Sequence, residues 1–250
     1  MGGAAAVGDA TNRLELARGI LRRVEDRATS VRPVVAAESD ARLLPVVEPL
    51  ARLLPSGGLR RGSTVALPEP QAGTSLLLAL LAEASAAGAW VGVAGRPELG
   101  LVAAAEAGVR LERLALVPEP GGDLLAVTIA LLEGMDIVVV AGPALGGVQA
   151  ADRHRLGARA RRGGAVLVAL GPWRGADVEL RCTDAQWHGP DAGAGRLCAR
   201  QVRVQSRGRG LAPGGRWARL MLPARDRPVA PVEAAEPVER IDRVMTRAAG

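Results

Sequence analysis

The feature that most constrains the fold is a series of five short apolar runs, separated from one another by segments of helical length. These runs do not alternate polar with apolar residues, which is typical of parallel strands that crossover helices bury on both faces. The order of strands and helices therefore predicts an α/β fold with a mostly parallel sheet flanked by helices. The predicted strands are 63–67, 89–94, 114–117, 137–141 and 165–170. The predicted helices between them are 74–87, 98–107, 123–133 and 149–162.

Local signals support two of these helices. Pro97 is expected in the first turn of the helix that follows it, where its missing N–H is not needed. Asp123 is expected at the N-cap of the next helix, where its carboxylate can accept a backbone hydrogen bond.

The pattern changes after residue 177. The segments 177–183, 197–205 and 216–222 alternate polar with apolar residues, which indicates antiparallel strands with one face in water. We expect them to extend the parallel sheet at one edge.

Three regions follow from these patterns. Residues 1–54 form an N-terminal helical segment and connector, with an amphipathic helix over 11–27 that either covers the core or mediates self-association. Residues 55–222 form the α/β core. Residues 223–250 form a Pro/Ala-rich tail with a short C-terminal helix, which is either an inert end or a docking segment laid in a partner's groove. The apolar residues of that helix are Val238, Ile241, Val244 and Met245.

Composition excludes several classes of protein. All 32 basic residues are arginine, which excludes mechanisms that need a lysine of this chain, and the formal net charge is +6. No apolar run approaches the ~18 residues of a membrane span, and residues 1–10 do not have the pattern of a secretory signal. Two cysteines and two histidines make neither a disulfide framework nor a zinc site. We therefore expect a cytoplasmic protein with no metal.

The loop after the first predicted strand has the position of a phosphate-binding P-loop but departs from its pattern. Such a loop needs glycines, a lysine for the outer phosphates and a Ser or Thr hydroxyl for Mg²⁺. Here Pro68 stands at the first glycine and Thr74 at the lysine, whereas Gly73 and Ser75 fit. The loop is thus either a structural turn between strand and helix or a weak nucleotide site without hydrolysis.

Residues 57–80 resemble the start of the RecA recombinase core, which has a Gly-Gly-Leu-x-x-Gly segment before its P-loop strand. A second similarity lies at 201–213, where Arg207 and Arg209 precede an Ala-Pro pair. In that family the corresponding basic residues lie at a subunit interface and reach a neighbour's nucleotide. The resemblance implies a RecA-like core over about two thirds of the chain.

The departures from the RecA pattern imply that hydrolysis has been lost. Ala141 stands where the family has the aspartate that supports Mg²⁺, and Arg96 stands at or beside the position of its water-activating glutamate. The segments 142–148 and 171–175 are too short for the family's two DNA-binding loops. We therefore expect a protein without enzymatic activity or cofactor, in which weak residual nucleotide binding remains open.

The chain length, the degenerate RecA core, the arginine-rich composition and the Pro/Ala-rich tail together resemble one branch in particular. This branch is the RecA-like mutasome accessory proteins of actinobacteria (ImuA′). The resemblance implies a non-catalytic scaffold in SOS-induced mutagenesis and translesion synthesis, associated with the nucleoid when DNA is damaged. Its implied partners are an ImuB-like adaptor, which is an inactive Y-family polymerase homologue, and an error-prone DnaE-type polymerase. Two alternatives stay open: a divergent ATPase of the RecA/KaiC type and a DNA-binding modulator of recombination.

Arginines gather late in the chain. Six arginines and no acidic residue lie between 153 and 174, and seven arginines and no acidic residue lie between 196 and 219. Such a stretch is either a solvated sheet edge or a surface for weak contact with DNA or an acidic partner. The candidate contact residues are Arg200, Arg203, Arg207 and Arg209.

Overall fold

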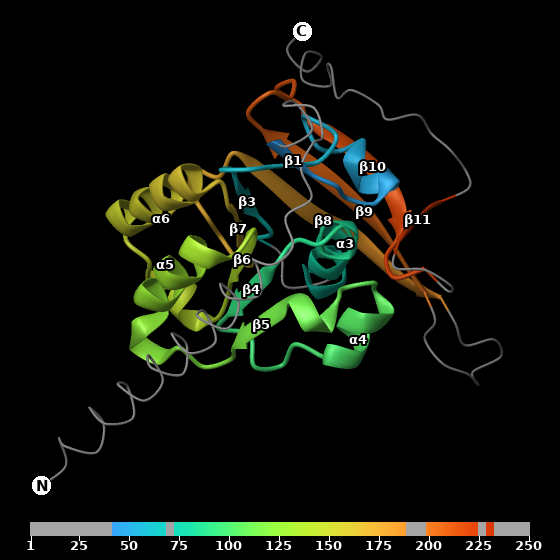
Figure 1. Ribbon diagram of the computed structural model, residues 1–250. Helices are drawn as coiled ribbons and strands as arrows, with labels where there is room; N and C mark the ends of the chain where they lie inside the picture. Colours follow the sequence, from blue (N-terminus) through green and yellow to red (C-terminus); the bar gives the residue numbers. More distant parts are fainter. Residues whose placement is uncertain (1–41, 69–72, 189–198, 225–228, 233–250) are drawn as a thin grey trace, which may run out of the picture.

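The computed structural model describes residues 42–68, 73–188, 199–224 and 229–232. Within these residues the chain forms a nine-stranded mixed sheet with helices on both faces (Figure 1). The strand order is β11-β10-β9-β8-β3-β7-β6-β4-β5. The predicted α/β class, the mostly parallel arrangement and the antiparallel C-terminal extension are confirmed.

The parallel half of the sheet is made by the five predicted apolar runs. Its strands are β3 (Thr64–Ala66), β4 (Val91–Ala94), β5 (Leu114–Val117), β6 (Ile137–Val140) and β7 (Val166–Ala169). The crossover helices are α3 (Gly73–Ala86), α4 (Leu101–Glu106), α5 (Leu124–Gly134) and α6 (Ala150–Gly163). In β6, Val139 belongs to the apolar cluster beneath α3 and Val138 to the cluster beneath α5 and α6. Both faces are buried, so an alternating pattern was never required.

The antiparallel extension continues the sheet beyond β3. Its strands are β8 (Val178–His188), β9 (Ala199–Gly208), β10 (Arg216–Met221) and β11 (Ala230–Pro231). β8 pairs in parallel with β3 and antiparallel with β9. One face of the extension, with Leu180, Val202 and Leu220, joins the α3 cluster. This agrees with the predicted single buried face.

The residues just before β3 pack as part of the same core. They form β1 (Leu43–Leu44), α2 (Glu48–Ala51) and β2 (Leu59–Arg60). Leu44, Leu50 and Leu54 are fully or almost fully buried in the cluster that contains α3. The expected division between 54 and 55 therefore falls inside a continuous packing unit. The predicted tail is not wholly separate from the core, because β11 lies within 223–250 and pairs with β10. The helix predicted over 11–27 and the short helix predicted at the C-terminus lie outside the described residues.

Several boundaries differ from the sequence predictions. α4 begins at Leu101 rather than at 98, and Pro97 lies in a turn closed by a hydrogen bond from the Leu99 N–H to the Arg96 carbonyl. Asp123 does precede α5, but its side chain makes no capping hydrogen bond. Three short 3₁₀ helices were not predicted: η2 (Leu111–Arg113), η3 (Gly121–Asp123) and η4 (Pro143–Gly147). Among the described helices, none has the length and apolar character that crossing a membrane requires.

Candidate functional site

The first candidate site is the amino end of α3, where a P-loop would place the phosphates. Thr74 and Ser75 lie in the first turn of this helix. Arg96, which follows β4, donates a hydrogen bond from Nη2 to Thr74 Oγ1 at 2.9 Å. Its Nη1 also lies 3.2 Å from Glu98 Oε1. The residue predicted at the place of a water-activating glutamate thus holds the residue at the place of the lysine.

Arg200 holds the neighbouring hydroxyl in the same way. Its Nη2 donates to Ser75 Oγ at 3.1 Å, and its Nε donates to the Leu222 carbonyl at 3.0 Å. The guanidinium also lies over the half-exposed ring of Trp187, 4.9 Å from its centre. Arg200 is only 8% exposed, and this burial lowers the pKa of its guanidinium below the usual value. Arginine remains charged at neutral pH despite such a shift.

These contacts do not fit a nucleotide with its Mg²⁺, which the fold family would imply. Mg²⁺ binds oxygen ligands at about 2.1 Å, and the Ser75 hydroxyl that would serve it already accepts a hydrogen bond from a guanidinium. A divalent cation at this hydroxyl would lie beside a buried positive charge, which repels it strongly at short range. In the residues described, no cluster of three or more metal-binding side chains is present.

The strand ends opposite this helix are closed by backbone contacts. Ala141, at the place of the metal-supporting aspartate, is buried and bonds through its N–H to the Ala94 carbonyl. A Cβ added to Gly95 would lie 2.3 Å from the Ala141 carbonyl oxygen, and one added to Gly142 would lie 2.9 Å from the Gly95 oxygen. The chain therefore leaves no space for larger side chains where β4 and β6 end.

Of the remaining P-loop positions, the structure describes Pro68 and Gly73. Pro68 follows β3, and a Cβ at Gly73 would approach Leu170 to 3.2 Å, so the helix start packs closely against the end of β7. The two short connections are as predicted: η4 fills most of 142–148, and Trp173 is buried within 171–175.

The four candidate contact arginines separate into three places. Arg200 is buried as described above, so it is not part of an exposed contact surface. Arg203 and Arg207 point outward from β9, on the face opposite the buried Val202. Arg209 follows β9 and its exposed side chain lies 3.6 Å from the Asp177 carboxylate. The candidate docking residues Val238, Ile241, Val244 and Met245 lie outside the described residues.

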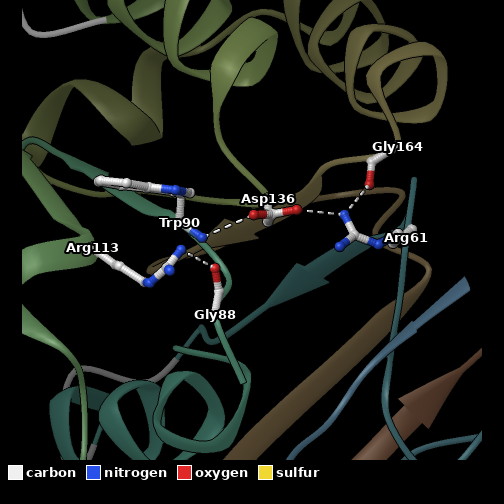
Figure 2. Close-up of polar contacts among 6 residues, drawn as sticks. All are labelled: Arg61, Gly88, Trp90, Arg113, Asp136 and Gly164. Carbon is white, nitrogen blue, oxygen red and sulfur yellow. Dashed lines mark hydrogen bonds and ion pairs between the residues drawn. The ribbon is translucent and has the colours of Figure 1, made fainter. Parts of the chain in front are cut away.

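Two aspartates at the amino ends of strands were missed by sequence reasoning. Asp136 accepts hydrogen bonds from Arg61 Nη1 at 2.7 Å and from the Trp90 N–H at 2.9 Å, and Arg61 also reaches the Gly164 carbonyl (Figure 2). Asp177 is buried and accepts from the Thr64 N–H at 2.9 Å. Asp136 stands directly before an apolar run and Asp177 directly before an alternating segment, and these positions were the available signal.

A pocket of about 320 Å³ lies beside Asp177, at the end of β3 away from the P-loop remnant (Pro68, Gly73, Thr74 and Ser75). Its lining includes Leu54, Leu59 and Val178 as apolar walls, with Arg209 at the side. Since Thr64 and Arg209 already satisfy the Asp177 carboxylate, this pocket presents no unpartnered carboxylate to a ligand.

Comparison with known proteins relates the chain to a mycobacterial protein. The uncharacterized protein Rv3395c of Mycobacterium tuberculosis is 37% identical over 169 residues, which cover 62% of this chain and 81% of that protein. The chain belongs to the family of this protein. A family model described as the MT3502 N-terminal domain matches residues 52–175, which include the P-loop remnant and the helix α6.

Among solved structures, the crystal structure of the RadB recombinase is similar in fold. It has a TM-score of 0.52 and 17% sequence identity, and the match covers 73% of this chain and 96% of that one. The fold of this chain is therefore RecA-like, as the order of its elements predicts.

Proposed function

We propose that this chain is a RecA-like accessory protein without ATPase activity, which acts as a scaffold in DNA-damage-induced mutagenesis. In this role it brings an ImuB-like polymerase adaptor and an error-prone DnaE-type polymerase together near DNA lesions. The observation that carries the proposal is that Arg96 and Arg200 occupy the hydroxyls of Thr74 and Ser75.

The physical argument concerns what phosphoryl transfer requires. That reaction depends on positioning and on charge stabilisation by a lysine, a metal and a water-orienting side chain. This chain has no lysine, Ala141 has no carboxylate, and Arg96 is directed at Thr74. The guanidinium of Arg96 cannot take the part of a compact ammonium while it is bound to Thr74 and Glu98.

The place in mutagenesis is supported by the sequence resemblance at 57–80 together with the RecA-like fold. A RecA-like fold that keeps its sheet and flanking helices but lacks the catalytic side chains still has stable surfaces to which other proteins can bind. Association with the nucleoid during DNA damage follows from the same proposal.

The absence of catalysis is tested with the purified full-length chain. We expect no Mg²⁺-dependent release of phosphate from ATP above the level measured with Ser75→Ala. Turnover that requires Mg²⁺ and disappears in Arg96→Ala would support the divergent ATPase instead. The matched control for Arg96→Ala is Arg155→Ala, which removes an exposed arginine of α6.

The scaffold role is tested by co-expression with the adaptor and the DnaE-type polymerase. We expect the three proteins to co-elute in size-exclusion chromatography with or without ATP. Deletion of 233–250, which spares β11 and the buried Val229, is expected to release the adaptor if the tail is the docking segment. Failure of the full-length chain to co-elute with either protein contradicts the scaffold role, and tight binding to single strands without any partner supports a modulator of recombination.

A further inference from the structure

The antiparallel extension has a second face, which we call the open face. Its residues point away from α3 because strand residues alternate between faces. In the register, Arg203 of β9 lies between Thr183 of β8 and Arg219 of β10. The next rows along the strands place Gln205 between Arg181 and Trp217, and Arg207 opposite Glu179.

None of the described helices covers this face. The apolar cluster beneath α3 takes Leu180, Val202 and Leu220 from the other side of the same strands. No residue of the open face belongs to either apolar cluster. Figure 1 shows α5 and α6 over the parallel strands, with neither helix reaching β9 or β10. The open face is therefore a surface of strands that the described helices leave uncovered.

The charge of the open face is mainly positive and partly unpaired. Arg181 pairs with Glu179 at 2.6 Å, and Arg203 lies 3.4 Å from Asp184. The side chains of Arg207 and Arg219 are exposed and make no hydrogen bond or ion pair with any residue that the structure describes. Strand geometry separates their Cα atoms by roughly 14 Å, so the two side chains are placed to engage separate anionic groups rather than one.

The basic surface continues onto α6. Gly157 of this helix packs near Thr64 of β3, and Gly62 packs against Arg161, which places α6 alongside the strand that pairs with β8. Arg155 and Arg162 of α6 are exposed as well. The open face and α6 thus border one another along β3.

We propose that the open face binds the phosphate backbone of DNA without reading its sequence. Arginine, threonine and glutamine side chains, which make up most of this face, are residues that bind phosphates in DNA complexes. The guanidinium of Arg203 covers Trp217 at 4.6 Å from the ring centre, and Trp217 is only 8% exposed, so this ring is not available to stack on bases. Binding is therefore electrostatic and directed at the backbone.

The same composition argues against a protein partner on this face. Protein interfaces have an apolar or aromatic centre, whereas here Met221 is the partly exposed apolar side chain that shares the open face with Trp217. Interfaces with DNA are more polar and more positive than those between proteins. The inference does not depend on whether the chain hydrolyses ATP.

The experiment measures binding of fluorescein-labelled duplex and single-stranded DNA of mixed sequence by the full-length chain, using anisotropy over a range of salt. The variant is Arg207→Ala/Arg219→Ala. Its matched control is Arg52→Ala/Arg110→Ala, which removes the same charge from two exposed positions on the α3 side of the sheet, one directly after α2 and one in the turn after α4.

Each lost phosphate contact is expected to weaken duplex binding about eightfold at about 0.1 M salt, so the double variant weakens it about 60-fold. The slope of log K against log salt is expected to fall by about two, and the control is expected to stay within about twofold of the wild type. Arg207→Lys/Arg219→Lys should keep most of the affinity because it keeps the charge. Thermal melting monitors folding, and Arg207→Gln/Arg219→Gln replaces the alanine variant if that variant is unfolded.

Three results overturn the proposal: no DNA binding by the wild type, equal losses in the variant and its control, or competition by polyglutamate as effective as competition by unlabelled DNA. The last result assigns the face to an acidic polypeptide. Co-elution of Arg207→Ala/Arg219→Ala with the adaptor separates this test from the proposed scaffold role, which is expected to survive the substitution.

Discussion

Among the partly exposed polar residues, Asp136 is expected to contribute most to the free energy of unfolding, because it links the amino ends of β3, β4 and β6. Truncation in Asp136→Ala leaves the Trp90 N–H without its acceptor and leaves the Arg61 guanidinium with only the longer contact to the Gly164 carbonyl. Hydrogen bonds to a charged group contribute about 1.5–3 kcal/mol each. Because the side chains of Arg61 and Asp136 are 33% and 28% exposed, water replaces part of this loss, and we expect a net cost of about 2 kcal/mol.

For a chain of this size that cost lowers Tm by about 4–8 °C. The measurement is thermal and urea unfolding followed by circular dichroism. Asp136→Asn is expected to cost about half as much, because an amide oxygen still accepts from Trp90 while the charge opposite Arg61 is lost. A double-mutant cycle with Arg61→Ala should give a coupling energy of about 1 kcal/mol.

The matched control is Glu133→Ala. This residue forms an ion pair with Arg159 at 3.0 Å, but its side chain is 59% exposed, and such pairs contribute about 0.5 kcal/mol or less. If Asp136→Ala and Glu133→Ala unfold alike, or if the cycle with Arg61 is additive, the reasoning about this network is wrong.

Two further predictions concern packing. Gly95→Ala is expected to lower the free energy of unfolding by more than about 3 kcal/mol, because its backbone has φ +79° and the new Cβ meets the Ala141 carbonyl. Gly175→Ala, with φ +83° and nothing within 4 Å, should lower it by only about 1–2 kcal/mol, and equal urea midpoints for the two variants would refute the clash. Leu50→Ala should cost about 2–5 kcal/mol because the side chain is fully buried, whereas Val102→Ala, at 72% exposed, should change stability by less than about 0.5 kcal/mol. A mild Leu50→Ala would show that the segment before residue 55 is not part of the folding unit.

The parallel strands could be predicted from the sequence because burial on both faces leaves an unusual pattern. Runs such as 137–141 and 165–170 contain no polar residue, and short apolar runs between glycine-ended helices have few other solutions. The end of β8 could not be found in this way. Residues 184–188 are exposed on both sides of that strand, so pairing with β9 extends it without any apolar alternation.

The contacts at the P-loop remnant are only partly visible in the sequence. The loss of the lysine and of the aspartate follows directly from Thr74 and Ala141. The inward direction of Arg200 could have been inferred, because it is in phase with Val202 and Val204, which face the core. The bond from Arg96 to Thr74 joins residues 22 positions apart on different elements, and no local pattern indicates it.

The closed strand ends and the open face lead together to a last prediction, that nucleotide does not regulate DNA binding. A ligand can shift an equilibrium only by its difference in affinity for two states. With Ser75 held by Arg200 and the ends of β4 and β6 in backbone contact, the groups that the structure describes at this site are already engaged within the chain. The open face, moreover, is formed by β8, β9 and β10 and lies on the side of the sheet opposite α3.

We therefore expect the dissociation constant for duplex DNA to change by less than about twofold when Mg²⁺-ATP is added at constant ionic strength, since salt alone alters such binding. Anisotropy titrations with and without the nucleotide measure this directly, and sodium sulfate at equal ionic strength is the control. A change of about tenfold or more corresponds to a coupling free energy of about 1.4 kcal/mol, and linkage would then require DNA to change the affinity for ATP by the same factor. That result would mean that the P-loop remnant binds nucleotide and that this binding is coupled to DNA binding at the open face, so nucleotide-dependent regulation would have been retained.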